Sequence, residues 1–170
     1  MTRPRRAFIG LGSNLSDRLA LLQSAKRSLS LLPDTQYIAR SSLYRSSPIG
    51  EADQPFLNAA ILLETTLCSR RLLDLLLAIE DQHGRVRTSR WGNRTLDLDL
   101  LCVLDQHNTH EIMEEQALVL PHPQLIFRDF VLLPLEELDP SLRIAGVSLR
   151  THREALRPEQ LTVQETLSTW

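Results

Sequence analysis

Gly84 to Leu101 reads Gly-Arg-Val-Arg-Thr-Ser-Arg-Trp-Gly-Asn-Arg-Thr-Leu-Asp-Leu-Asp-Leu-Leu, a basic segment that runs directly into an apolar one. The apolar part, residues 95–104, is predicted to be a β-strand. Because residues two apart on a strand point to the same face, Asp97 and Asp99 are expected to lie side by side. Leu96, Leu98 and Leu100 then face the other way, into the core of the protein.

Asp97 and Asp99 on one face make a candidate metal site. Two carboxylates held this close repel each other unless a positive charge lies between them. Mg²⁺ prefers oxygen ligands and is commonly held by one or two carboxylates together with substrate phosphates. Guanidinium groups pair well with phosphate oxygens, and the same segment carries Arg85, Arg87, Arg90 and Arg94. The stretch therefore indicates a site for a polyphosphate with Mg²⁺; the alternative is that these are solvent-exposed charges.

The length and composition restrict the class of protein. A chain of 170 residues is long enough to bury a full core, so we expect one domain, residues 1–170. The net charge of -2 and the pI near 6.2 give no overall basic field that would attract nucleic acid. Cys68 and Cys102 have neither a metal-ligand nor a redox spacing. No apolar run resembles a signal peptide or a membrane span, and we expect a cytoplasmic protein.

Apolar periodicity and turn residues predict the order of the elements. Strands are expected at about 7–11, 35–44, 57–67 and 95–104, and helices at about 16–32 and 69–83. The order strand, helix, strand, strand, helix, strand is typical of an α+β, ferredoxin-like βαββαβ sandwich, here with long active-site loops at 45–56 and 84–94. After it we expect a polar turn at 105–116, a short strand at 117–120, a helix at 130–138 interrupted by Pro134, and a C-terminal extension that is poorly defined after about residue 144.

A few other residues are candidates for a binding site. Gly10-Leu11-Gly12-Ser13-Asn14 lacks the Gly-Lys-Ser/Thr ending of a phosphate-binding loop and is interpreted as a structural turn. His122 lies between two prolines, which restrain its backbone, although a loop histidine without a role is equally compatible with this. Phe56 and Asn58, two residues apart, combine a ring with an amide that could read a flat heterocycle. Arg128 and Phe130, also two apart, could put a cation and an aromatic ring on one side of a site. The alternative is that these rings belong to the core.

Taken in order along the chain, these motifs resemble those of the 6-hydroxymethyl-7,8-dihydropterin pyrophosphokinase family of folate biosynthesis. The resemblance covers most of the chain, with matching blocks at Phe8–Leu15, Tyr44–Gly50, Gln54–Ala60, Ile79–Glu80, Gly84–Arg87, Arg90–Gly92, Arg94–Asp99, Pro121–Pro123 and Arg128–Phe130. It implies an ATP-dependent diphosphotransferase that transfers diphosphate from ATP to the pterin hydroxymethyl group and releases AMP. It also implies two Mg²⁺ ions bound with ATP. We expect a monomer whose partners are ATP and the pterin, with no nucleic acid and no membrane.

The resemblance further implies roles for individual residues. Asp97 and Asp99 would hold the metal ions, and Arg85 and Arg94 would assist the transfer. ATP would be contacted by Glu80, Arg87, Trp91, Arg94, Leu100, His122 and Arg128. The pterin would be contacted by Ser46, Ser47, Ile49, Phe56, Asn58, Trp91, Asp97 and Phe130, with the rings of Phe56 and Phe130 on its two faces.

Some positions depart from the family pattern, and two other functions stay open. Asn93 precedes Arg94 where the family usually has Pro, Ser, Ala or Glu, Ser47 stands where proline is common, and Ile126-Phe127 replaces a more polar stretch. One rival function is an RNA-binding module on the same scaffold, with the arginines on phosphates; the other is an inactive paralogue. RNA recognition of that type stacks bases on exposed sheet aromatics, whereas aromatic residues are 5% of this chain.

Overall fold

A six-stranded antiparallel sheet forms the centre of the structure, a computed structural model that describes residues 3–48, 52–84 and 93–170. β1 (Arg5–Ser13) lies between β4 (Phe56–Thr65) and β5 (Asp97–Leu104) and is antiparallel to both. On its other edge, β4 pairs with β2 (Thr35–Arg40) and β3 (Leu43–Ser46). β10 (Val163–Leu167) pairs with the outer edge of β3, so the strand order is β10-β3-β4-β1-β5.

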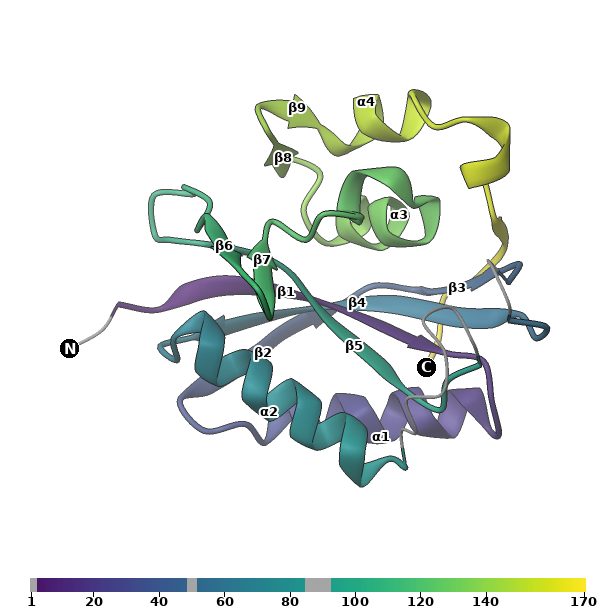
Figure 1. Ribbon diagram of the computed structural model, residues 1–170, viewed down its shortest axis with the longest axis horizontal. Coiled ribbons are helices and arrows are strands. Elements are labelled where there is room, and N and C mark those ends of the chain that lie inside the picture. Colours follow the sequence, from purple (N-terminus) through teal and green to yellow (C-terminus); the bar gives the residue numbers. More distant parts are fainter. Residues whose placement is uncertain (1–2, 49–51, 85–92) are drawn as a thin grey trace.

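Helices cover both faces of this sheet (Figure 1). α1 (Arg18–Ser30) and α2 (Ser69–Gln82) lie on one face, and α3 (Asp129–Leu138) and α4 (Leu149–Glu154) lie on the other. The shorter elements are β6 (Met113–Glu115), β7 (Leu118–Leu120), η1 (Leu125–Phe127), β8 (Arg143–Ile144), β9 (Val147–Ser148) and η2 (Pro158–Gln160). With β2 and β3 counted as one interrupted strand, the order up to β5 confirms the predicted ferredoxin-like βαββαβ sandwich.

Local sequence signals explain where the two helices of the βαββαβ unit begin and end. The side chain of Asp17 accepts a hydrogen bond of 3.0 Å from the Ala20 N–H and so caps the first turn of α1. α2 buries Leu72, Leu76 and Ile79, which recur at helical spacing and therefore share one face. Its end is followed by Gly84 at φ +71°, a left-handed conformation that suits glycine after a helix.

Side chains on the two faces of the sheet fill two separate hydrophobic cores. On β4, Ile61 packs in the core beneath α1 and α2, and its neighbours Ala60 and Leu62 pack in the core beneath α3. Leu96, Leu98 and Leu100 join the first of these cores, as predicted. The register of β1 with β5 shifts between Phe8 and Ile9, a β-bulge that adds Leu101 to β5 and turns both Leu101 and Cys102 toward the α3 side. The alternation leaves Asp97 and Asp99 on that α3 side as well.

The prediction of a single strand at 35–44 is wrong, because the chain breaks at Ser41 and Ser42. The hydroxyl of Ser41 accepts a hydrogen bond of 2.9 Å from the Ala60 N–H, a position that a strand carbonyl would normally fill. The Ser42 N–H donates to the carboxylate of Glu137 at 2.9 Å instead of to β4. Side chains thus replace backbone partners at two consecutive residues, and the ladder is interrupted between β2 and β3.

Three further predictions are corrected by the structure. Gly12 and Ser13 belong to β1 rather than to a turn. The segment 105–116 contains strand β6, which pairs with β7, in addition to turns. Pro134 lies inside a continuous α3 rather than interrupting it. After residue 144 the chain forms α4, which packs against α3, and β10, which pairs at the sheet edge.

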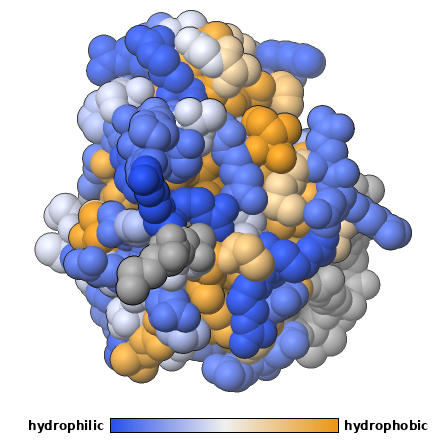
Figure 2. Space-filling view, turned by 90° about the vertical axis from the view of Figure 1, so that its left-hand side faces the viewer, coloured by the Kyte–Doolittle hydropathy of each residue, from blue (hydrophilic) through white to orange (hydrophobic). Residues whose placement is uncertain are grey.

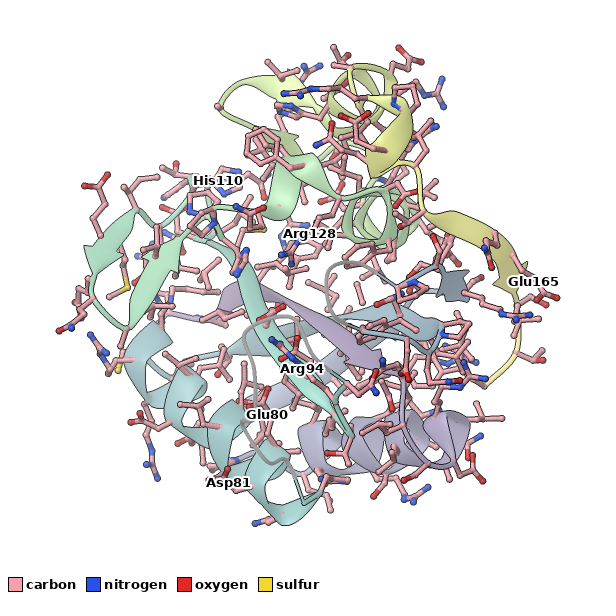
Figure 3. All side chains as sticks on the ribbon, turned by 45° about the vertical axis from the view of Figure 1, so that its right-hand side comes forward. Glu80, Asp81, Arg94, His110, Arg128 and Glu165 are labelled. Atoms are coloured by element: carbon pink, nitrogen blue, oxygen red, sulfur yellow. The ribbon has the colours of Figure 1, made fainter. Side chains whose placement is uncertain are left out.

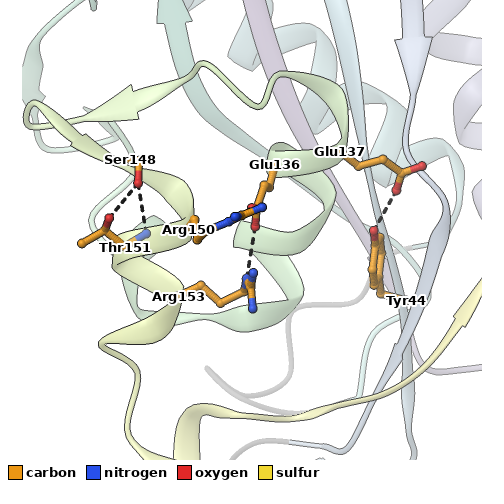
Figure 4. Close-up of polar contacts among 7 residues, drawn as sticks. All are labelled: Tyr44, Glu136, Glu137, Ser148, Arg150, Thr151 and Arg153. Carbon is orange, nitrogen blue, oxygen red and sulfur yellow. Dashed lines mark hydrogen bonds and ion pairs between the residues drawn. The ribbon is translucent and has the colours of Figure 1, made fainter.

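Polar contacts hold α3 against its neighbours (Figure 4). Glu136 accepts hydrogen bonds from Arg150 at 3.2 Å and Arg153 at 3.1 Å, both on α4. Glu137 accepts a hydrogen bond of 2.7 Å from the hydroxyl of Tyr44 on β3. Burial, together with the carboxylate of Glu137, raises the pKa of Tyr44, so its hydroxyl keeps the proton that it donates. These contacts fix α3 relative to both α4 and β3.

Polar side chains predominate on one face of the molecule (Figure 2). On the face shown in Figure 2, hydrophilic residues cover most of the area and hydrophobic residues show as smaller areas between them. Within the described part of the chain, no helix has an apolar stretch long enough to cross a membrane.

Candidate active site

A cavity of about 330 Å³ opens on the α3 side of the sheet. Residues of β1, β4 and β5 line it from the sheet, the end of β3 lines it on one side, and the segment from His122 to Val131 lines it on another. The structure brings ten of the predicted site residues together here: Ser46, Ser47, Phe56, Asn58, Arg94, Asp97, Asp99, His122, Arg128 and Phe130. The cavity is therefore the place where the sequence-predicted residues can act on one ligand.

Two glycines on β1 keep the space in front of the carboxylates open. Gly12 is paired with Asp97 and Gly10 with Asp99. A Cβ atom on Gly12 would lie 3.3 Å from Asn58 Oδ1, and one on Gly10 would lie 3.3 Å from the side chain of Leu101. Any larger residue at these positions would occupy part of the cavity, which is a common reason for glycine within a strand.

The electrostatics of the cavity are set by Asp97 and Asp99. Burial and then the nearby charge of Asp97 raise the pKa of Asp99 to about 7, although the guanidinium groups of Arg128 and Arg94 act in the opposite direction. Arg94 Nη1 lies 2.6 Å from Asp97 Oδ2 and forms an ion pair with it. Figure 3 shows Arg94 beside β5 and Arg128 on the α3 side of the sheet. The raised pKa means that an additional cation beside Asp99 would be favoured.

His122 is a neutral hydrogen-bond donor in this arrangement. Burial, and then the charge of Arg128, lower its pKa, so the imidazole is uncharged at neutral pH. Its Nδ1 accepts a hydrogen bond of 3.2 Å from the Gln124 N–H, which places the ring proton on Nε2. The Nε2–H can therefore donate to an oxygen atom of a ligand in the cavity.

The backbone of Arg94 is held by a pair of asparagines. Asn14 Oδ1 accepts a hydrogen bond of 2.6 Å from the Arg94 N–H, and the Asn14 N–H donates to the Arg94 carbonyl at 3.1 Å. The amide nitrogen of Asn14 donates in turn to Asn93 Oδ1 at 2.8 Å, and Asn93 Nδ2 donates to Asp53 Oδ1 at 2.7 Å. Asn93, a departure from the family pattern, thus takes part in positioning the residue that follows it.

Two phenylalanines and an amide line the other part of the cavity. Phe56 begins β4 and Phe130 lies in the first turn of α3. The amide nitrogen of Asn58, a buried residue, donates to Ser46 Oγ at 2.9 Å and to the Tyr44 carbonyl at 3.3 Å, and these bonds fix the amide orientation. The guanidinium carbon of Arg128 lies 5.7 Å from the centre of the Phe130 ring. This part of the cavity can receive a flat, polar-edged ring system.

The remaining predicted site residues lie elsewhere or outside the described ranges. Glu80 is buried on α2, where its carboxylate accepts a hydrogen bond of 2.7 Å from the Leu98 N–H. The side chain of Leu100 packs in the core beneath α1 and α2 and is not among the described residues that line the cavity. Arg85, Arg87, Trp91 and Ile49 lie outside the described residues.

Sequence reasoning missed several residues that build this site. Gly10 and Gly12 were interpreted as part of a strand and a structural turn and not as site residues, although glycines facing two carboxylates across a strand pair are a signal of close approach. Asn14 was not singled out, and its hydrogen bonds to Arg94 depend on residues 80 positions apart. Gln124 and Val131 also line the cavity and carry no motif of their own.

The donor set agrees with a Mg²⁺ site. Both carboxylates line the cavity, and the repulsion that raises the pKa of Asp99 is what a divalent cation would relieve. Over residues 3–48, 52–84 and 93–170, no group of three or more His, Cys, Asp and Glu side chains converges as a complete metal cage. Mg²⁺ suits such an open site, because it usually takes one or two carboxylates and fills its other positions with water and substrate phosphates.

The sequence matches the family described as 7,8-dihydro-6-hydroxymethylpterin-pyrophosphokinase (HPPK) over residues 8–140. Relatives named 2-amino-4-hydroxy-6-hydroxymethyldihydropteridine pyrophosphokinase include one from Methylorubrum extorquens, 42% identical over 154 residues, which are 90% of this chain and 94% of the relative. Another, from Pseudomonas aeruginosa, is 44% identical over 141 residues, 82% of this chain and 84% of the relative.

Solved structures share the fold. The wild-type HPPK-DHPS protein of Plasmodium falciparum, crystallised with pterin and p-hydroxybenzoate, superposes with a TM-score of 0.68 at 13% identity, covering 91% of this chain and 43% of that one. The chain thus spans less than half of that longer protein. The RNA-binding and inactive-paralogue alternatives find no support in these comparisons, and α3 covers the sheet face that an RNA-binding module would expose.

Proposed function

The chain belongs to the 7,8-dihydro-6-hydroxymethylpterin-pyrophosphokinase family, and we propose that the cavity on the α3 side of its sheet is where it transfers diphosphate from ATP to 6-hydroxymethyl-7,8-dihydropterin. The reaction releases AMP and belongs to folate biosynthesis. One observation supports this location above the others: two carboxylates, two arginines and two phenylalanines from distant parts of the chain line a single cavity. A triphosphate requires charged groups that bind its oxygens or its metal ions, and a pterin requires rings that stack on it.

Asp97 and Asp99 are the residues that would hold Mg²⁺ in this site. When bound, Mg²⁺ would supply positive charge that neutralises the phosphate oxygens of ATP and helps to orient them. Arg94 and Asp97 are already paired, so the guanidinium group is held beside one of the carboxylates that would hold the metal. Glu80 on α2 supports β5 from the α2 side of the sheet, because its hydrogen bond from the Leu98 N–H fixes the backbone between Asp97 and Asp99.

Phe56, Phe130 and Asn58 would bind the pterin. The rings would stack on its two faces, and the carbonyl oxygen of Asn58 would accept a hydrogen bond from its polar edge. Ser46 keeps the Asn58 amide in the required orientation. Asp97, which lines the cavity near Gly12 opposite Phe56, would be within the region where the pterin hydroxyl lies.

Arg94, Arg128 and His122 would bind the triphosphate. Their two guanidinium groups and the Nε2–H of the neutral imidazole are all donors to phosphate oxygens. In the reaction the pterin hydroxyl oxygen forms a bond to the β-phosphorus, and the bond from that phosphorus to the α,β-bridging oxygen breaks. The bridging oxygen keeps the electron pair and leaves as a phosphate oxygen of AMP, and the hydroxyl proton passes to solvent. Transfer of this kind depends mainly on positioning and on charge stabilisation, and preorganised arginines provide both.

An AMP-release assay tests the proposal. Purified protein with ATP, Mg²⁺ and 6-hydroxymethyl-7,8-dihydropterin is expected to form AMP and the pterin diphosphate in equal amounts, and to form neither without the pterin. Asp97→Ala is expected to abolish the activity in a folded protein, whereas Asp74→Ala, which removes an exposed carboxylate on α2, is the matched control. ADP as the product, or full activity of folded Asp97→Ala, would contradict the proposal.

Other expectations from the sequence stay predictions. These are the roles of Arg85, Arg87, Trp91 and Ile49, the contact of Leu100 with ATP, the number of Mg²⁺ ions, the monomeric state and the cytoplasmic location. Analytical ultracentrifugation of the purified protein tests the monomeric state directly.

A further inference from the structure

The carboxylate of Asp129 is buried, and each of its two oxygen atoms accepts two hydrogen bonds. Its residue is 3% exposed and lies between Arg128 and Phe130, two of the residues that line the cavity. Asp129 Oδ2 accepts hydrogen bonds from the N–H groups of Thr162 at 2.6 Å and Val163 at 2.8 Å. Its Oδ1 accepts from the Thr162 hydroxyl at 2.7 Å and from the Phe130 N–H at 2.8 Å.

Thr162 continues this set of hydrogen bonds to the opposite side of the cavity. Its carbonyl oxygen accepts hydrogen bonds from the Ser47 N–H at 2.9 Å and from the Ser47 hydroxyl at 3.3 Å. The next residue, Val163, pairs with Ser46 at the start of the ladder between β10 and β3. One residue of the C-terminal segment is therefore bonded both to the start of α3 and to the end of β3.

These contacts join the two sides of the cavity that would hold the pterin. Phe130 is on the α3 side, and Ser46, which orients the Asn58 amide, is on the β3 side. Glu137, near the end of α3, also bonds to Ser42 and Tyr44 in the β3 region. At the start of α3, by contrast, the contact with the far end of β3 runs through Thr162 and Val163. Neither Asp129 nor Thr162 is among the described residues that line the cavity. A direct contact with substrate is thus not their contribution.

We propose that Asp129 and Thr162 are positioning residues, which hold Phe130 and the Ser46–Ser47 segment at the separation that the pterin requires. The inference rests on the proposed pterin site. A buried carboxylate is stable only when donors surround it, and hydrogen bonds to a charged group are shorter and stronger than neutral ones. The four donors observed here therefore define one relative position of α3, β3 and the C-terminal segment. The C-terminal segment thereby acts on binding although it contributes no group to the ligand.

Asp129→Asn tests this inference with almost no change of shape. Whichever way the amide is oriented, its NH₂ group faces at least one backbone N–H that the carboxylate accepted from, so the set of hydrogen bonds is broken. We expect the dissociation constant for 6-hydroxymethyl-7,8-dihydropterin, measured by titration calorimetry with a non-hydrolysable ATP analogue and Mg²⁺, to rise about tenfold, which is about 1.4 kcal/mol. The KM for the pterin should rise in parallel, while the dissociation constant for ATP changes less than about twofold.

Thr162→Val provides a second variant if Asp129→Asn does not fold. It removes only the hydroxyl bond to Asp129 and keeps both backbone bonds, so a smaller rise in the same constant is expected. Glu165→Gln is the matched control, since it makes the same carboxylate-to-amide change on the exposed side of β10, at the sheet edge in Figure 3. It should leave both dissociation constants unchanged.

The outcomes distinguish a failure of the proposed function from a failure of the positioning role alone. If the wild-type protein forms no AMP with the pterin, the proposed function is wrong. If the wild type is active and folded Asp129→Asn and Thr162→Val both bind the pterin as the wild type does, only the positioning role is wrong. A loss of thermal stability with unchanged pterin affinity, or an equal loss of pterin and ATP affinity, would show that Asp129 has a structural role alone.

Discussion

Replacing Asp99 by asparagine should make the metal-free protein more stable while it destroys the activity. The pKa of Asp99 rises from 3.8 to about 7 because burial and the charge of Asp97 both disfavour its ionised form. At about 1.4 kcal/mol for each tenfold change in acid dissociation, ionisation of this carboxyl costs the folded state up to about 4 kcal/mol. Solvent reaches part of Asp99 and reduces this ceiling. An amide of the same shape carries no charge and avoids the cost.

The raised pKa of Asp99 also determines how the stability difference between the wild type and Asp99→Asn changes with pH. Well below the unfolded-chain pKa of 3.8 the carboxyl is protonated in both the folded and the unfolded chain, so the two proteins should differ little. As the pH rises, the unfolded chain ionises first and the wild-type folded state loses stability relative to it, until the difference is complete above pH 7. The advantage of Asp99→Asn should therefore be larger at pH 8 than at pH 5.

Differential scanning calorimetry with EDTA measures this advantage. For a chain of this length, 1 kcal/mol corresponds to about 2–4 °C in Tm, so even a quarter of the ceiling is detectable. Asp74→Asn on the exposed face of α2 is the matched control and should show little pH-dependent gain. With Mg²⁺ and ATP, the wild type should gain more stability than Asp99→Asn. An Asn variant that is no more stable than the wild type at pH 8, or equally stabilised at pH 5 and pH 8, would refute the electrostatic argument.

Three further variants test the other parts of the site. Phe130→Ala should weaken pterin binding more than ATP binding, because a stacked ring contributes roughly 0.5–1.5 kcal/mol beyond its buried area; equal losses in calorimetric titrations would place the ring in the core instead. Arg94→Lys should lower kcat by at least about tenfold with a smaller change in the ATP dissociation constant, since an ammonium group lacks the planar fork; a raised KM at unchanged kcat would indicate that Arg94 binds ATP without assisting the transfer. Asn93→Ala removes the hydrogen bonds to Asn14 and Asp53, and we expect a loss of about 1 kcal/mol in unfolding free energy together with a severalfold lower kcat. An unchanged kcat in this variant would mean that Asn14 alone fixes the Arg94 backbone.

The parts of the fold that were predicted are those determined by residues close in sequence. The two helices predicted at about 16–32 and 69–83 and the inward face of Leu96, Leu98 and Leu100 depend on neighbours within a few positions, and these predictions are confirmed. The break between β2 and β3 was missed because its cause is a carboxylate 95 residues away, Glu137. The place of β10 was missed for the same reason, since its partner β3 lies more than a hundred residues earlier in the chain.

In the candidate site, too, the features that depend on residues close in sequence were predicted, and those that depend on distant residues were not. Asp97 and Asp99 were predicted to share a face from the period of a strand alone, and both line the cavity. The resemblance to a family supplied most of the other residues, but not the contacts that hold them. The bond from Leu98 to Glu80, the clamp of Asn14 on Arg94 and the bonds from Thr162 to Asp129 each join elements that meet only in the folded protein.

The pairing of β10 with β3 has a consequence for how the protein is made. β10 follows every other strand of the sheet in the chain, so the ribosome delivers it after the rest of the sheet. Domains begin to fold from their N-terminal part during synthesis, and until β10 arrives the outer edge of β3 presents unpaired N–H and C=O groups. Such an edge is a template for pairing with a second nascent chain. Slow translation of the last third, or premature termination within it, should therefore favour aggregation over loss of activity alone.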